Sequence, residues 1–124
     1  MAQKKAEPAS VATIPERASM IYVKNVSFDS VITELKREGY TIGKVFERES
    51  IVTKYKRLPK FPPRSLAIHI RYLDSTAQIS GTLYVSKNGV ATDEIVIRDK
   101  MYPLAFDTIN AFAIALKGEI SYQE

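Results

Sequence analysis

The chain of 124 residues contains no cysteine, no tryptophan and a single histidine, His69. The lack of cysteine excludes disulfides, thiol catalysis and thiolate metal sites. One histidine cannot form a zinc site built on several imidazoles. Glu47 and Glu49 share one side of an extended segment, but two carboxylates without further ligands do not define a metal site. We therefore expect no metal, no cofactor and no enzymatic activity.

Long hydrophobic runs are also lacking. No apolar stretch approaches the ~20 residues of a membrane-spanning helix, and the first residues lack the apolar core of a signal peptide. We expect an intracellular, cytoplasmic protein with no membrane partner. Residues 1–19 contain Pro8 and Pro15 and no apolar periodicity, which predicts a disordered N-terminal arm. Residues 20–124 are then a single domain.

Two segments carry the signals of a helix. In the first, Ser27 is a good N-cap and Gly39 a C-terminal stop. The second has Pro103 near its start and Gly118 just after its end. Each has an apolar stripe at helical spacing: Phe28, Val31, Ile32 and Leu35 in the first, and Ile109, Phe112, Ala113 and Leu116 in the second.

Strand signals fill most of the remaining sequence. Alternation over residues 66–72 and 78–86 predicts two strands joined by a four-residue loop, 74–77, with Arg71 opposite Ser80. Residues 20–23 and 41–57 are β-prone, and residues 47–50 are either a hairpin turn or a bulge. A tight turn at Asn88-Gly89 would mix apolar and polar faces, so we expect a longer loop before the last strand.

This order of elements predicts an α+β fold: an antiparallel β-sheet of four to five strands with two helices packed on one face. An exposed edge strand of such a sheet could pair with a second copy, so a homodimer is among the partners we consider.

Positive charge is concentrated in one part of the chain. Residues 20–64 hold ten basic and five acidic side chains, whereas residues 65–124 hold five basic and seven acidic ones. Residues 54–64 combine five cations and two aromatic rings with no acid. Cations suit phosphates and rings suit unpaired bases, so this segment predicts binding of single-stranded nucleic acid.

The predicted site has three kinds of residue. Phosphate contacts are assigned to Lys54, Lys56, Arg57, Lys60 and Arg64, base stacking to Tyr55 and Phe61, and an extension of the surface to Arg71 and Tyr84. The leading hypothesis is a small non-enzymatic nucleic-acid-binding protein that prefers single strands, whether DNA or RNA.

Two alternatives stay open. The protein is instead a protein–protein interaction module, an inhibitor or assembly factor, if the same segment docks an acidic protein. A nuclease that uses His69 with Arg71 is a more distant alternative, because the sequence identifies no carboxylate partner for the histidine.

Overall fold

The computed structural model describes residues 14–59, 64–100 and 102–124, with the backbone alone at Lys87. Its elements, in chain order, are β1 (Met20–Lys24), α2 (Phe28–Arg37), β2 (Ile42–Phe46), β3 (Ser50–Thr53), β4 (Lys56–Arg57), β5 (Ser65–Leu73), β6 (Thr76–Lys87), β7 (Val90–Ile95), α3 (Pro103–Ala115) and β8 (Glu119–Gln123).

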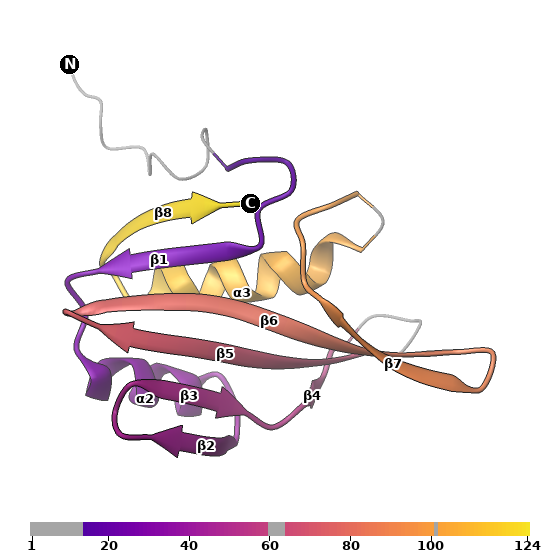
Figure 1. Cartoon of the computed structure of the whole chain (residues 1–124), viewed down its shortest axis with the longest axis horizontal. Coiled ribbons are helices and arrows are strands. Elements are labelled where there is room, and N and C mark those ends of the chain that lie inside the picture. Colours follow the sequence, from indigo (N-terminus) through magenta and orange to yellow (C-terminus); the bar gives the residue numbers. More distant parts are fainter. Residues whose placement is uncertain (1–13, 60–63, 101) are drawn as a thin grey trace.

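The strands form one antiparallel sheet in the order β2-β3-β5-β6-β1-β8. Strand β4 pairs with β5 beyond the end of β3, and β7 pairs with β6 beyond the end of β1. Helices α2 and α3 both lie behind the sheet in Figure 1. The opposite side of the sheet, which faces the viewer, is called the helix-free face below.

The predicted count of four to five strands is wrong, because the described residues form a sheet of eight strands. The ambiguous segment 41–57 forms the hairpin β2–β3 and the two-residue strand β4. Strand β8 follows Gly118 and extends the sheet beyond β1. A strand of two residues has no period to detect. Strand β8 does alternate Ile120 and Tyr122 with polar residues, a strand signal that the prediction overlooks.

The first helix follows its predicted signals. The Ser27 side chain accepts a hydrogen bond from the Ser30 N–H (3.1 Å), and Gly39 ends the helix with φ +88°. Phe28, Val31 and Leu35 are buried as expected. Glu34, a charged residue outside the apolar stripe, is also buried and only 8% exposed.

The hairpin β5–β6 turns more tightly than predicted. Its turn is Asp74-Ser75, both with positive φ (52° and 59°), and Leu73 pairs with Thr76. Arg71 therefore lies opposite Gln78, and the predicted pairing with Ser80 is wrong. The register differs by two residues, so every side chain keeps its predicted face.

The hairpin β6–β7 also corrects a prediction. Its turn is the tight Asn88-Gly89 (φ 52° and 80°), which pairs Leu83 with Glu94, and the longer loop is wrong. Such positive φ values match the twist of a two-residue hairpin. All six residues of β7 are exposed. The strand has no buried apolar face, so a register that mixes apolar and polar residues costs little.

Residues 47–50, left open between a turn and a bulge, begin with a turn. Glu47 and Arg48 have positive φ (49° and 56°), and the Glu49 N–H donates to the Phe46 carbonyl (2.8 Å). The hairpin β2–β3 closes here, and its irregular register lies further along, between Ile42 and Lys44.

Residues 14–19, part of the predicted arm, contact the folded domain. Ala18 is fully buried, and the Ser19 N–H donates to the Gln123 carbonyl (2.9 Å). The Arg98 guanidinium donates to the carbonyls of Ile14 (3.1 Å) and Pro15 (3.3 Å). Residues 1–13 of that arm lie outside the described residues.

The core lies between the sheet and the two helices. Its fully buried side chains come from the inward positions of the strands and from α2 and α3, among them Ile21, Ile51, Leu66, Ile68, Ile70, Ile79, Leu35 and Phe112. At Gly81 the inward position of β6 is empty, and a Cβ there would overlap the Ile109 side chain. The missing side chain allows α3 to pack directly on β6.

Gly118 permits a second close approach. A Cβ at this position would overlap the carbonyl oxygen of Lys24 and come within 2.7 Å of Val23 Cγ1. The neighbouring Lys117 takes the left-handed conformation (φ 63°) that ends α3. Gly118 therefore serves the packing of the chain against β1, whereas the sequence suggested a helix stop.

We expect Gly118→Ala to lower the free energy of unfolding by about 1–3 kcal/mol, because the added methyl group forces the backbone of β1 and β8 apart. Urea unfolding followed by circular dichroism measures this. Ser121→Ala, an exposed position on β8, is the control and should change stability by less than about 0.5 kcal/mol. Equal stability of the two variants would contradict the packing role of Gly118.

Candidate nucleic-acid interface

The basic segment 54–64 is divided between the two sides of the sheet. Lys60 and Phe61 lie outside the described residues. In β4, Lys56 pairs with the buried Leu66 and Arg57 pairs with Ser65. Since neighbouring residues of a strand point to opposite faces, Lys56 lies on the helix side and Arg57 on the helix-free face.

The cations on the helix side contact the protein itself. Lys56 Nζ donates to the Glu38 carbonyl (2.7 Å) and lies 4.9 Å from the centre of the Tyr40 ring. The Arg64 guanidinium lies 4.2 Å above the Tyr102 ring. Both side chains therefore stabilise the ends of helices.

The helix-free face brings two predicted tyrosines together. The rings of Tyr55 and Tyr84 are 5.6 Å apart and inclined by 58°, and both side chains are nearly half exposed. The Tyr55 hydroxyl donates to Asp93 (2.6 Å). Partial burial, together with this hydrogen bond, raises the pKa of Tyr55 to about 12. This ring is therefore uncharged and fixed in orientation at neutral pH.

Arg71, the next predicted residue, lies in the middle of the same face. Direct cross-strand partners point to the same side of a sheet. Following the pairs of Arg71 across the sheet gives the arginine row, which consists of Phe46, Ser50, Arg71, Gln78, Tyr22 and Ser121. At ~4.8 Å per strand, Phe46 and Tyr22 each lie about 10 Å from the arginine, on opposite sides.

The neighbouring row is the histidine row, which consists of Lys44, Val52, His69 and Ser80. His69 Nε2 lies 2.9 Å from the Thr82 hydroxyl. Burial lowers the pKa of His69, so the imidazole is neutral at pH 7. The described residues of the two rows include the cations Lys44 and Arg71 and no carboxylate, so the middle of the face favours an anion.

Two hollows flank Arg71. The larger, about 510 Å³, is lined by Met20, Ser50, His69, Ser80, Thr82 and Ile95 together with Arg71. The smaller, about 310 Å³, contains Tyr22 and Gln78 and has the carboxylates of Glu49 and Asp74 on its wall. The larger hollow is the better place for an anionic ligand, because its lining has one cation and no carboxylate.

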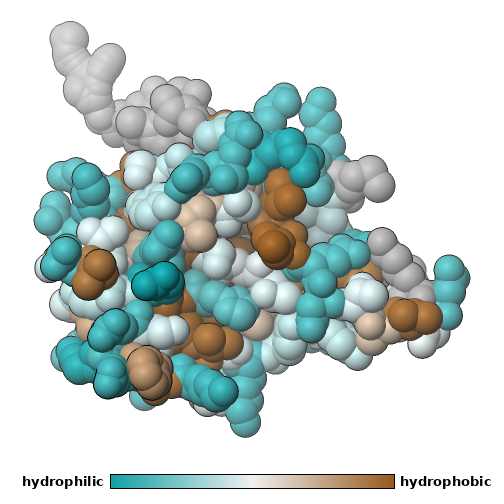
Figure 2. Space-filling model, in the orientation of Figure 1, coloured by the Kyte–Doolittle hydropathy of each residue, from teal (hydrophilic) through white to brown (hydrophobic). Residues whose placement is uncertain are grey.

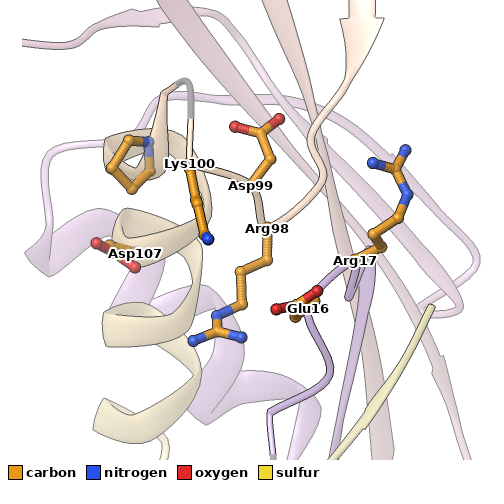
Figure 3. Close-up of a pocket in the computed structure, with 7 residues that line it drawn as sticks. Glu16, Arg17, Arg98, Asp99, Lys100 and Asp107 are labelled. Atoms are coloured by element: carbon orange, nitrogen blue, oxygen red, sulfur yellow. The ribbon is translucent and has the colours of Figure 1, made fainter.

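A third cavity, about 690 Å³, lies between the segment before β1 and the start of α3 (Figure 3). Three cations and three carboxylates line it, namely Arg17, Arg98, Lys100, Glu16, Asp99 and Asp107. Asp99 accepts a hydrogen bond from the Tyr102 N–H (3.0 Å), and Arg98 holds the chain at residues 14–15. This balanced charge gives a polyanion less attraction than the arginine row.

No protein-family model matches the chain, and a search of curated proteins finds no match. Within the described ranges no three histidine, cysteine, aspartate or glutamate side chains lie close enough together to hold a metal ion. No helix in the same part of the chain is long and apolar enough to cross a membrane. What the protein binds must therefore be inferred from the arrangement of its own residues.

The structure adds Phe46, Tyr22 and Ser50 to the residues considered from the sequence. Phe46 falls on β2 and Tyr22 on β1. The pairings that bring them into the row of Arg71, β3 with β5 and β1 with β6, are long-range, and no local pattern reveals them. Of the predicted residues, Tyr55, Arg57, Arg71 and Tyr84 share the helix-free face. Lys54 is exposed, and its N–H donates to the Thr41 carbonyl (2.8 Å).

The contact between Lys56 and the end of α2 includes an unusual carboxyl group. Burial, followed by the hydrogen bond and the charge of the neighbouring Glu34, raises the pKa of Glu38 from its ordinary value of 4.5 to about 7. The folded state therefore holds this proton more tightly than the unfolded chain. Its contribution to the free energy of unfolding decreases as pH rises from about 4.5 to 7.

We expect Glu38→Gln to become more stable relative to the wild type as the pH rises from 4.5 to 8, since the glutamine stays uncharged beside Glu34. Urea unfolding at several pH values gives the difference between the two proteins. The control is Glu47→Gln, an exposed position in the β2–β3 turn, whose difference from the wild type should vary less with pH. A Glu38→Gln difference that is flat across this range would refute the raised pKa of Glu38.

Proposed function

We propose that this protein binds single-stranded nucleic acid on the helix-free face of its sheet and catalyses no reaction on it. The observation that carries the proposal is the arginine row: Arg71 lies between two aromatic side chains, Phe46 and Tyr22, on an open sheet face. Single-strand-binding sheets use the same combination, in which a cation holds phosphate and rings stack on bases.

The surface of this face supports the proposal. Figure 2 shows this side of the molecule as mostly hydrophilic or intermediate in colour, with separate hydrophobic spots. Phe46 is 65% exposed, and Tyr55 and Tyr84 are 45% and 43% exposed. Exposed rings scattered over a polar surface suit stacking on bases better than they suit a large apolar protein interface.

Four of the residues predicted from the sequence contribute to this surface. Arg57 and Arg71 supply cations, and Tyr55 and Tyr84 supply a pair of rings near one end of β5 and β6. Lys56 and Arg64 are assigned to the helix side, where they stabilise the protein. The basic segment therefore contributes through its alternate residues, and the sheet provides the rest of the site.

A second candidate function is a protein-interaction module. It is favoured by β7, which is exposed along its whole length and, among the described residues, pairs with β6 alone. Val90 and Ile95 are 62% and 71% exposed. The outer edge of such a strand can accept a strand of another protein. A stoichiometric protein that co-purifies with the wild type and is lost from a Val90→Ser/Ile95→Ser variant would favour this candidate.

We expect Arg57→Ala/Arg71→Ala to weaken binding of labelled single-stranded DNA or RNA in fluorescence anisotropy. The slope of log affinity against log salt should become shallower by about 1.4, at about 0.7 for each lost phosphate contact. Duplex DNA should bind more weakly than either single strand.

The control carries the same change in net charge away from the helix-free face. Lys36→Ala/Lys100→Ala removes one exposed cation on α2 and one beside α3, and should keep the wild-type slope. If the wild type binds no single strand even at low salt, the proposed function is wrong.

A further inference from the structure

The larger hollow on the helix-free face has an architectural cause. One edge of β6 pairs with β1 up to Ile79 and with β7 from Thr82 onward, so the two strands separate at Ser80 and Gly81. Beyond β7 the chain turns inward, where Val96 is buried and its N–H donates to the Gly81 carbonyl (3.0 Å). The sheet surface is therefore depressed at this junction, in the middle of the proposed binding face.

The volume of this hollow, about 510 Å³, lies within the range of small-ligand pockets. Its lining has two kinds of surface. Met20 and Ile95 supply apolar walls, while Ser50, Ser80 and Thr82 supply hydroxyls that can both donate and accept hydrogen bonds. A nucleobase has the same two kinds of surface, since its faces are apolar and its edges carry donors and acceptors.

The charges of the lining residues also suit an uncharged base beside a charged phosphate backbone. The imidazole of His69 is neutral and already aligned by Thr82. Arg71 is exposed, pairs with Ser50 on one side and Gln78 on the other, and lines both hollows. A strand that crosses the sheet along the arginine row therefore passes the mouth of the larger hollow with its phosphate beside Arg71.

We infer that the hollow at the junction of β1, β6 and β7 seats one unpaired base of the bound strand, with the adjacent phosphate on Arg71. This inference rests on the proposed function and adds that binding depends on bases as well as on phosphates. Ser80, Thr82 and His69 contact the edge of the base, and Met20 and Ile95 contact its faces.

The test compares two labelled single strands of equal charge and of about ten nucleotides, a length within the usual range for such sites. One carries a base on every sugar, and the other is abasic throughout. We expect the wild type to bind the base-carrying strand at least about tenfold more tightly than the abasic strand. Ser80→Leu fills the hollow, so it should lower this preference to about twofold or less while the affinity for the abasic strand is kept.

A matched control lies on the same strand and the same face. Ser86→Leu places the same side chain on the exposed part of β6 opposite Ala91, away from the hollow, and should retain the wild-type preference. His69→Ala is a second test that adds no bulk, and it should reduce the preference at least threefold. Circular dichroism of each variant establishes that it is folded.

The outcomes separate the inference from the function on which it rests. If the wild type binds neither strand, the proposed function fails. If it binds both strands equally, single-strand binding stands and the base-seating inference is overturned. If the wild type prefers bases, and both folded Ser80→Leu and His69→Ala keep that preference, the bases lie elsewhere and the inference is likewise overturned.

Discussion

The hydrogen bonding of β6 is the constraint on which the rest of the structure depends. This strand is twelve residues long, and β5 occupies one of its edges over nine of them. The other edge is shared by β1 and β7, which come from distant parts of the chain. The chain between β7 and α3 must therefore leave the sheet at Gly81. The inward turn at Val96, the contact of α3 with β6 and the hollow on the helix-free face all follow from that exit.

The sheet also separates the cations that contact the helix side of the protein from those on the helix-free face. On the helix side, Lys56 contacts the end of α2 beside the buried Glu34 and the partly buried Glu38, and Arg64 contacts the Tyr102 ring. On the helix-free face, Arg57 and Arg71 are exposed. Charge counted along the sequence does not distinguish these two roles. The alternation of a strand of two residues, β4, decides which cation of the basic segment reaches which face.

Local signals in the sequence were sufficient for the helices and for the faces of the long strands. Ser27, Gly39 and the apolar stripes act within a few residues of one another, so the first helix was predicted correctly. The faces of β5 and β6 were also correct, because a register error of two residues preserves them. The mixing of apolar and polar faces argues against a tight turn only where the strand is half buried. Because β7 is exposed on both sides, the tight β6–β7 turn forms despite that mixing.

The candidate site was only partly predictable for a related reason. Arg71 and Tyr84 lie on strands with clear alternation, whereas Phe46 and Tyr22 reach the same row through β2 and β1. The β2–β3 hairpin is local, but its link to Arg71 through β3 and β5, like the link of β1 to β6, joins distant parts of the sequence, and no local pattern encodes those two pairings. The hollow is less predictable still, because it arises where two strands separate along a third.

The exposure of β7 also affects how the sequence of this protein can evolve. Each of its six side chains faces solvent, while the buried Leu83 and Val85 of the adjoining β6 hold the base of the hairpin. Apart from Asp93, which accepts the Tyr55 hydrogen bond, and Glu94, substitutions along β7 thus cost little folding free energy, so mutations can accumulate there without loss of the native state. Ile95 lies at the end of β7 and forms one wall of the larger hollow. Selection can therefore alter the shape of that wall through a strand that the core does not constrain.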